Sequence, residues 1–260
     1  MTTKTALVTG ASAGIGRAFA TGLAIRGYDV VLVARDGARL AELADELTRA
    51  HGIVADALPA DLLTADGLAA VEARLTDADR AVDLLVNNAG FLTVGRFAEL
   101  DIEPEVREVE LNVVALMRLT RAALGAMEAR RAGAILNMAS IGAYQPAPHS
   151  ATYAATKAFV HSFTNAVHEE ERGSGVHVMV VCPGFTHTEI HDRAGLGRSE
   201  IPEFVWQSAE QVVDSALRDL DRRRATSIPG PINQILAAFS SVVPAGISRR
   251  IAGEFTKRMG

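Results

Sequence analysis

The feature that most constrains this chain is a regular alternation between short apolar runs and longer segments with helical spacing. The apolar runs contain few charged residues, which is typical of strands buried on both faces of a sheet. They are residues 5–9, 29–34, 53–60, 83–86, 134–138 and 176–181, with a weaker seventh near 225–228. The segments with helical spacing are 15–26, 38–50, 65–78, 105–129, 151–172 and 208–220.

This alternation predicts an α/β fold, because each parallel strand needs a crossover that packs a helix back onto the sheet. We expect a doubly wound, Rossmann-like parallel sheet of about seven strands with helices on both faces, a three-layer αβα sandwich. The chain has 260 residues, 48% hydrophobic and 22% charged, so a single domain over residues 1–260 is expected. Within it, residues 184–204 are interpreted as a substrate-side loop and residues 229–260 as a C-terminal cover.

A glycine-rich turn follows the first predicted strand and opens the first predicted helix. It reads Thr9-Gly10-Ala11-Ser12-Ala13-Gly14-Ile15-Gly16. Glycines permit a tight turn and close approach of the backbone to a pyrophosphate, while the helix N-terminus supplies unpaired N–H groups for an anion. The turn therefore predicts a dinucleotide site. Its expected members here are Gly10, Ser12, Gly14, Ile15 and Gly16.

The residue that ends the second predicted strand distinguishes the two nicotinamide cofactors, because a carboxylate there binds ribose hydroxyls and repels a 2′-phosphate. The chain instead has Arg35, whose planar guanidinium suits a phosphate, and Ser12 can add a hydroxyl. The cofactor is therefore expected to be NADP(H). Asp36, the next residue, is either a ribose ligand or the N-cap of the following helix, and we favour the cap.

Tyr153 and Lys157 lie four residues apart at the start of a predicted helix, so they share one face. A phenol is a poor acid at neutral pH, but a nearby cation stabilises the phenolate, and we expect Lys157 to lower the pKa of Tyr153. Ser140 follows the fifth predicted strand and can bring a hydroxyl to the same edge of the sheet, where it would polarise a carbonyl. Alone, the spacing of Tyr153 and Lys157 also fits a half-buried tyrosine beside a surface lysine.

Together these motifs resemble the short-chain dehydrogenase/reductase family, in its single-domain, NADP(H)-preferring branch, from residue 5 to residue 228. The resemblance rests on the order and spacing of the glycine turn, Asn87-Asn88-Ala89-Gly90, Ser140, Tyr153, Lys157 and Pro183-Gly184. It implies an NADPH-dependent oxidoreductase that interconverts a ketone or aldehyde and an alcohol by hydride transfer. One departure is Ala139, where many relatives have a second serine.

The resemblance also implies roles for individual residues. Tyr153 is the expected general acid/base, Lys157 binds the nicotinamide ribose, Ser140 orients the substrate oxygen, and Asn112 holds a water for proton relay. The residues implied around the adenosine half are Asp61, Leu62, Asn88, Ala89 and Gly90. Those implied around the nicotinamide and pyrophosphate are Pro183, Gly184, Thr186 and Thr188, together with Tyr153 and Lys157.

The substrate is less well defined by the sequence. Four residues, Phe185, Leu196, Phe204 and Trp206, favour an apolar small molecule or an acyl substrate, although core packing explains them equally well. Two other functions stay open. One is a noncatalytic NADPH-binding regulator, and the other is a peripheral membrane enzyme that reduces lipids or steroids.

Charge and cysteine content limit the partners of the chain. A net charge of −5 without long basic runs argues against nucleic-acid binding, and the basic residues 222–224 are interpreted as the solvated end of a helix. The single cysteine, Cys182, gives no sign of an oxidising compartment, so a cytoplasmic protein with a buried thiol is expected. Residues 228–247 are largely apolar, but three prolines interrupt them, so membrane contact is not expected.

Two further expectations concern metals and subunits. His187 and His191 lie four residues apart but lack the order of a zinc-protease motif, so no metal site is predicted. From the family resemblance we expect a homodimer or homotetramer, with the predicted helices 105–129 and 151–172 as contact surfaces, acting on a small molecule.

Overall fold

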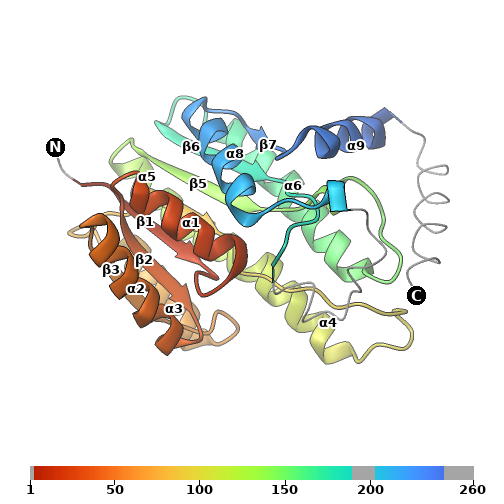
Figure 1. Cartoon of the computed structure of the whole chain (residues 1–260), viewed down its shortest axis with the longest axis horizontal. Coiled ribbons are helices and arrows are strands. Elements are labelled where there is room, and N and C mark those ends of the chain that lie inside the picture. The colour runs from red at the N-terminus through yellow and green to blue at the C-terminus, as the bar shows by residue number, and fades with distance from the viewer. Residues whose placement is uncertain (1–2, 189–202, 243–260) are drawn as a thin grey trace.

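The computed structural model describes residues 3–188 and 203–242 of the chain. Seven parallel strands in this part form one sheet in the order β3-β2-β1-β4-β5-β6-β7 (Figure 1). The strands are β1 Thr5–Thr9, β2 Asp29–Ala34, β3 Ala55–Pro59, β4 Leu84–Asn87, β5 Gly133–Met138, β6 Val176–Val181 and β7 Thr226–Ser227. The predicted doubly wound parallel sheet is confirmed, including its weak seventh strand.

Helices cover both faces of the sheet. They are α1 Gly14–Ile25, α2 Gly37–His51, α3 Ala65–Thr76, α4 Ile102–Val109, α5 Leu116–Ala129, α6 Ala151–Glu170, α8 Ala209–Asp221 and α9 Pro231–Val242. The apolar residues of α1, α2 and α8 pack on one face, and those of α3, α5 and α6 pack on the other. Helix α9 lies at the far end of the molecule from β3 and α2 (Figure 1).

The strands are apolar throughout because each face of the sheet is buried under a helix layer. In β1, Leu7 packs with the layer of α3 and α5, while its neighbours Ala6 and Val8 pack with the layer of α1 and α8. All three side chains are 0% exposed. This alternation at a period of two residues explains why the strand signal in the sequence is a continuous apolar run.

The order of the strands reverses between β1 and β4. From β1 the chain adds β2 and β3 on one side, and then β4, β5, β6 and β7 on the other. At such a reversal two neighbouring crossovers diverge, which leaves a crevice outside the carboxyl ends of the strands. The glycine turn after β1 and the Asn87-Asn88-Ala89-Gly90 segment after β4 both lie at this point.

The prediction of one continuous helix over residues 105–129 is wrong in detail. The helical stretch begins earlier, at Ile102, and consists of α4, a π-helical segment η1 (Glu110–Ala115) and α5. A π segment is a local widening of an α-helix that often occurs at functional sites, and it shifts the direction in which later side chains point. Hydrophobic spacing cannot reveal it, because the apolar period continues on both sides.

Parts of two further predictions fall outside the described residues. These are 189–202 of the predicted substrate-side loop and 243–260 of the predicted cover. Within the described part, residues 231–242 of the cover are helical, as α9. Two short 3₁₀ turns, η2 (Ile141–Tyr144) and η4 (Glu203–Val205), complete the elements used below.

Candidate active site

The glycine turn brings the start of α1 unusually close to β1. Gly10 and Gly14 have φ angles of +67° and +53°, in the left-handed region that favours glycine. A side chain at Gly16 would place its Cβ 2.1 Å from the carbonyl oxygen of Gly10, so only glycine fits there. The N-cap of α1 is Ala13, which makes no side-chain cap hydrogen bond in the structure, and the first N–H groups of the helix thus suit an anion.

Hydrogen bonds join this turn to the end of β4. Asn88 donates from Nδ2 to the Thr9 carbonyl oxygen at 2.9 Å. The hydroxyl of Thr9 accepts from the backbone N–H groups of Asn88 and Ala89, at 2.9 and 3.0 Å. The two chain segments on either side of the crevice are therefore held in a fixed relation.

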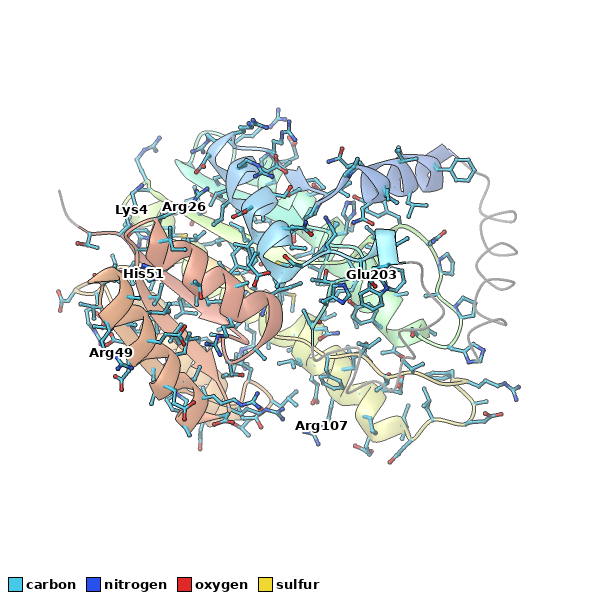
Figure 2. The ribbon with its side chains drawn as sticks, in the orientation of Figure 1. Lys4, Arg26, Arg49, His51, Arg107 and Glu203 are labelled. Carbon is cyan, nitrogen blue, oxygen red and sulfur yellow. The ribbon has the colours of Figure 1, made fainter. Side chains whose placement is uncertain are left out.

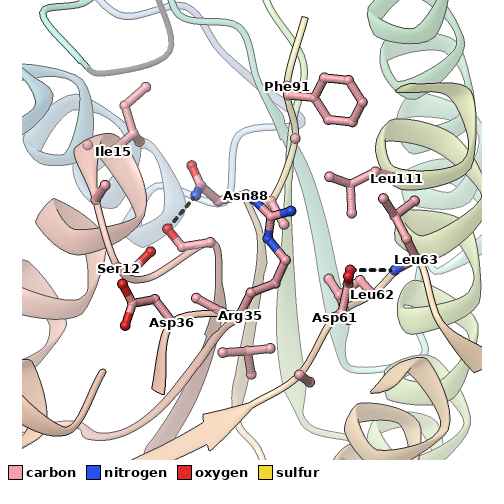
Figure 3. A pocket seen from close by; sticks show the side chains of 18 of the residues that line it. Ser12, Ile15, Arg35, Asp36, Asp61, Leu62, Leu63, Asn88, Phe91 and Leu111 are labelled. Atoms are coloured by element: carbon pink, nitrogen blue, oxygen red, sulfur yellow. Dashed lines mark hydrogen bonds between the residues drawn. The ribbon is translucent and has the colours of Figure 1, made fainter. Parts of the chain in front are cut away.

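A cavity of about 1100 Å³ lies along this edge of the sheet (Figure 3). Its volume suits a long ligand, because pockets for small molecules usually measure about 300–1,000 Å³. The predicted site residues that line it are Gly10, Ser12, Gly14, Ile15, Arg35, Asp61, Leu62, Asn88, Ala89, Gly90 and Thr188. Asp36, predicted as a helix N-cap, lines it too, as do residues not predicted as site members, namely Ala13, Val33, Ala34, Arg39, Ala60, Leu63, Phe91, Leu92, Pro104, Arg107 and Leu111.

Arg35 extends into the cavity from the end of β2. Figure 3 shows its side chain between Ser12 and Asp36 on one side and Asp61 on the other. Asp36 accepts a hydrogen bond from the backbone N–H of Arg39 at 3.1 Å and caps α2, which confirms the predicted N-cap. Because Asp36 is engaged in the cap, the exposed guanidinium of Arg35 is the charged group that this strand end presents to a ligand.

Three of the four predicted catalytic side chains, Ser140, Tyr153 and Lys157, lie near one another behind the cavity wall at Gly90. Lys157 lies with its Nζ 5.6 Å from the ring centre of Tyr153 and donates to the carbonyl oxygen of Met138 at 2.9 Å. A Cβ placed on Gly90 would lie 3.6 Å from the same Nζ, so Gly90 separates Lys157 from the cavity. Ser140 begins the η2 turn at the end of β5, and its Oγ accepts from the Gly142 N–H at 3.1 Å.

The predicted lowering of the Tyr153 pKa is wrong for this arrangement. Burial raises the pKa of Tyr153 to about 12, and a hydrogen bond with Ser140 opposes this rise only in part. Burial also lowers the pKa of Lys157 to about 8. The physical reason is that the Lys157 ammonium donates to the Met138 carbonyl, while Lys157 is buried and Tyr153 is half-buried. At neutral pH Tyr153 therefore retains its proton.

Asn112 is buried inside the π segment, 1% exposed, and its side chain is occupied by protein partners. Nδ2 donates to the Phe91 carbonyl oxygen at 2.9 Å and to the Thr156 hydroxyl at 3.2 Å. Oδ1 accepts from the Phe91 N–H at 3.2 Å. The amide thus holds the loop after Gly90 against α6, and its role in holding a relay water stays a prediction.

The segment after β6 connects the two ends of the site. The Pro183 carbonyl oxygen accepts from the N–H of Ile141 at 2.9 Å, next to Ser140. Thr186 forms a parallel bridge with Gln207. A Cβ on Gly14 would lie 3.0 Å from Thr188 Cγ2, so Thr188 reaches the glycine turn and lines the cavity.

Eight predicted site residues do not line the cavity: the catalytic side chains of Asn112, Ser140, Tyr153 and Lys157, which lie beside it, and four residues from the glycine turn and the segment after β6. The last four are Gly16, Pro183, Gly184 and Thr186. Gly184, for example, packs against Asn233 of α9, whose Oδ1 would lie 2.3 Å from an added Cβ. Sequence reasoning also missed two buried acids beside the catalytic side chains, Glu105 and Glu108, which are 4% and 0% exposed. No local signal marks them, since acids on a helix are normally exposed.

Several predictions about other residues can be compared with the structure. Cys182 is buried, as expected. Helix α8 ends at Asp221, and Arg224 pairs with Asp219 at 3.0 Å, which agrees with the interpretation of 222–224 as a helix end. Trp206 is 9% exposed and its ring packs 5.7 Å from that of Phe185. Leu196 and His191 lie outside the described residues.

Within residues 3–188 and 203–242, no cluster of three or more histidine, cysteine or acidic side chains is placed to bind a metal ion. Among the helices of the same ranges, none combines the length and apolar character needed to cross a bilayer.

The lining suits a dinucleotide with a phosphorylated ribose. The glycine cradle leaves no space for side chains at Gly10 and Gly16, so a pyrophosphate can approach the backbone. Arg35 lies at the end of β2, where the adenosine ribose would be expected. The apolar side chains of Leu62 and Leu111 line the walls between which an adenine would fit.

Comparisons with known proteins agree with this geometry. The chain matches the model of the short chain dehydrogenase family over residues 4–198. It is 30% identical over 256 residues to the very-long-chain 3-oxoacyl-CoA reductase of Bos taurus, covering 95% of this chain and 78% of that protein.

Two solved structures are similar along almost the whole chain. A short-chain dehydrogenase from Sphingobium yanoikuyae in complex with NADPH has a TM-score of 0.84 and 37% identity, covering 93% of this chain and 96% of that one. A bulky-bulky ketone specific alcohol dehydrogenase from Comamonas testosteroni has a TM-score of 0.80 and 31% identity, covering 94% and 96%. The protein is an α/β oxidoreductase, and it belongs to the short-chain dehydrogenase family.

Proposed function

We propose that this protein is an NADPH-dependent carbonyl reductase that interconverts a ketone or aldehyde and an alcohol. The observation that carries the proposal is the meeting of Ser140, Tyr153 and Lys157 beside Gly90, at the inner wall of a cavity that has Arg35 at its other end. The NADPH bound in the Sphingobium yanoikuyae structure supports this choice of cofactor.

The cofactor, when bound, supplies the hydride, and the chain supplies binding, orientation and the proton. The glycine turn and the N-terminus of α1 would hold the pyrophosphate, and Arg35 with Ser12 would hold the 2′-phosphate. Ser140 would donate a hydrogen bond to the substrate carbonyl oxygen. Tyr153 would give its proton to that oxygen as the C–O double bond becomes a single bond, and the Lys157 ammonium would stabilise the phenolate that remains.

The raised pKa of Tyr153, about 12, suits this direction of reaction. A group that must donate a proton has to be protonated at the start, and a half-buried phenol with a raised pKa meets this requirement at neutral pH. The substrate oxygen acquires negative charge as the hydride arrives. It therefore needs a proton at the stage when Tyr153 still carries one.

The pocket supports an apolar or acyl substrate. Phe91 and Leu92 line the cavity next to Gly90, and the ring of Phe185, after β6, packs at a tilt against that of Trp206. Among relatives of this chain, one is named as a very-long-chain 3-oxoacyl-CoA reductase and another as a bulky-bulky ketone specific alcohol dehydrogenase. Both names describe carbonyl substrates with large apolar groups.

A screen of ketones and 3-oxoacyl thioesters with NADPH tests the proposal. We expect NADPH consumption by the native chain on at least one apolar ketone, and a loss of about 100- to 10,000-fold for Tyr153→Phe, the contribution typical of general acid catalysis. NADPH binding by Tyr153→Phe should stay close to native. Equal rates for the two proteins would contradict the role of Tyr153.

The main alternative is a regulator that binds NADPH without catalysis. It predicts NADPH binding without turnover on every ketone tested. The intact set of Ser140, Tyr153 and Lys157 opposes it, because a sensor needs no acid positioned beside the nicotinamide end.

We also propose that the enzyme is a cytoplasmic homodimer or homotetramer. The outer surface of α5 and α6 supports association, since Met117 and Phe159 are 38% and 41% exposed there. A peripheral membrane enzyme would instead require detergent to enter the supernatant after cell lysis. Fractionation without detergent separates the two possibilities.

A further inference from the structure

Two carboxylates on α4 are buried next to the proposed catalytic side chains. Glu105 is 4% exposed and Glu108 is 0% exposed. Glu105 accepts a short hydrogen bond from the hydroxyl of Thr152, the residue before Tyr153. Burying an ionisable carboxyl group is costly unless it is paired, so both positions require an explanation.

Glu108 is held firmly on one side only. Its Oε2 accepts from the backbone N–H and the hydroxyl of Thr93, at 2.8 and 2.7 Å. Its Oε1 is buried and has no hydrogen-bond partner among the described residues. Thr93 belongs to the loop that follows Gly90, so Glu108 joins α4 to the wall of the active site. The backbone N–H and hydroxyl of Thr93 are neutral donors, so they fix the Glu108 carboxyl group in place without balancing its charge.

The charged and titratable groups around Glu108 come from two helices. Glu105, one turn earlier on α4, contacts Thr152 at the start of α6, and Lys157 of the same helix α6 lies behind Gly90, three residues before the Thr93 that binds Glu108. Both groups interact electrostatically with Glu108. Burial, with a smaller contribution from Glu105, raises the pKa of Glu108 above its ordinary value, and the hydrogen bonds from Thr93 and the charge of Lys157 oppose this rise only in part. In return, the Glu108 charge raises the pKa of both Lys157 and Tyr153. Cys182, at the end of β6, faces Lys157 as well.

We propose that Glu108 is a positioning residue that acts through Lys157 and Tyr153: its buried negative charge keeps both of them protonated and so extends the reaction to more alkaline pH. The kinetic part of this inference rests on the proposed function. Lys157 needs this help because it is buried, its ammonium donates to a neutral backbone carbonyl, and its pKa of about 8 lies close to the range in which enzymes work. Loss of its proton would remove the cation that stabilises the Tyr153 phenolate.

The opposing explanation is that Glu108 only anchors the Thr93 loop. The two explanations differ in the expected effect of removing the Glu108 charge while its side chain keeps the same size. Only the charge explanation predicts an effect on Lys157. Glu108→Gln keeps the size of the side chain and an oxygen that can accept from Thr93, but it removes the charge. Thr93→Val removes the hydroxyl that donates to Glu108 and keeps the charge.

Titration of Lys157 by NMR with isotope-labelled lysine tests the charge directly. The sequence has three lysines, Lys4, Lys157 and Lys257, so the spectrum is simple and Lys157→Arg assigns its signal. We expect the Lys157 midpoint to move to lower pH in Glu108→Gln and to stay near the native value in Glu108→Asp and in Thr93→Val. An unchanged midpoint in Glu108→Gln would overturn the proposal.

The pH profile of kcat/KM for ketone reduction, measured for the same variants, tests the effect of the charge on catalysis. Removal of the anion lowers the pKa of Lys157 and of Tyr153 alike, so the alkaline limb of Glu108→Gln should lie at lower pH than the native limb. Glu105→Gln is the matched control, because it also replaces a buried carboxylate on α4 and should leave the limb in place. A loss of rate with an unshifted limb would assign Glu108 to anchoring and contradict the proposal.

The native chain provides a test that needs no variant at position 108. As Glu108 takes up a proton in the acid range, the Lys157 signal should show a second inflection, and its absence would overturn the coupling. If no ketone is reduced by the native enzyme, the proposed function fails, while both NMR titrations still decide whether Glu108 controls Lys157.

Discussion

Arg35 is the residue on which the choice of cofactor depends in our proposal. Its guanidinium lies at the end of β2 and lines the cavity, while the neighbouring Asp36 is engaged as the N-cap of α2. Two adjacent residues therefore have different roles: Arg35 is available to bind a ligand, and Asp36 caps the helix. A carboxylate at the first position would favour NADH instead.

Arg35→Ala should reduce kcat/KM with NADPH by about 10- to 100-fold and leave the value with NADH nearly unchanged. The reason is the loss of charge-assisted hydrogen bonds to the 2′-phosphate, worth about 1.5–3 kcal/mol. Asp36→Ser is the control, since it keeps a capping side chain and removes the carboxylate. Rates with both cofactors measure the effect, and an unchanged NADPH to NADH ratio in Arg35→Ala would contradict the assignment.

His177 links a single residue to the stability of the fold. It lies in β6, 4% exposed, with its ring edge-on to His168 at 5.5 Å. Burial, with smaller effects from Arg223 and His168, lowers the pKa of His177 from 6.5 to about 4. The unfolded chain therefore binds more protons than the folded chain between these two pH values, and stability must fall as the pH decreases through this window.

Urea denaturation of the native chain and of His177→Leu at neutral and acidic pH checks this effect. We expect the native chain to lose about 1–3 kcal/mol more than the variant over the window, since each pKa unit corresponds to about 1.4 kcal/mol and some solvent reaches the ring. Parallel losses in the two proteins would show that His177 does not titrate in this way.

At the scale of elements, the contact between β1 and α1 depends on Gly16. A Cβ there would lie 2.1 Å from the Gly10 carbonyl oxygen and 2.5 Å from Asn88 Nδ2. Alanine at this position would push α1 away from the strand, and the N–H groups that suit a pyrophosphate would move with it.

Gly16→Ala should therefore lower both the stability and the affinity for NADPH, the latter by about 10-fold or more, because close approach to a phosphate needs the glycine geometry. Gly125→Ala in α5 is the matched helix substitution. Its Cβ meets only the flexible side chain of Arg121, at 3.3 Å, and alanine should stabilise the helix by about 1 kcal/mol. Thermal melting measures the stability of both variants, and NADPH titration measures their affinity. Native affinity in Gly16→Ala would contradict the prediction.

The π segment shows what a helix adds to the site that its sequence does not reveal. Asn112 lies inside it, and the widened turn carries the amide to both backbone groups of Phe91 and to Thr156. The sequence predicted a helix here and singled out Asn112 by resemblance. It could not predict that the helix would be interrupted, because the interruption is stabilised by partners more than 20 residues away in the chain.

At the scale of the whole molecule, the exposed face of α5 and α6 is the surface expected to join subunits. Met117 and Phe159 are exposed there, and Phe159 stacks on Phe163 at 5.8 Å. A shallow cavity of about 400 Å³ lies on the same face and includes Met117 and Phe163 in its lining. Apolar patches of this kind on a soluble protein commonly mark an interaction surface.

Phe159→Glu should weaken association by about 100-fold or more, because an unpaired charge in a buried interface costs about 3–5 kcal/mol. Ile25→Glu, which replaces a 66% exposed residue of α1 on the opposite face of the sheet, should leave association unchanged. Sedimentation over a range of concentrations measures both. If Phe159→Glu has the mass of the native protein, the contact surface lies elsewhere.

The cavity is also a property of the whole molecule. Arg35 follows the end of β2, and Arg107 lies on α4 (Figure 2). Both line the cavity, although they are far apart in the sequence. The sequence identified Arg35 because a strand end has a defined relation to the glycine turn. It did not identify Arg107, because nothing local predicts which side of α4 faces the crevice.

The sequence by itself determined the succession of strands and helices, the glycine turn and the four-residue separation of Tyr153 and Lys157, because these depend on periodicity and on contacts within a turn. Only the tertiary structure decided that Glu108 is buried where its charge acts on Lys157, and that the pKa of Tyr153 is raised rather than lowered. Solvation and electrostatic energies depend on everything that surrounds a group, and those surroundings are assembled from segments distant in the chain.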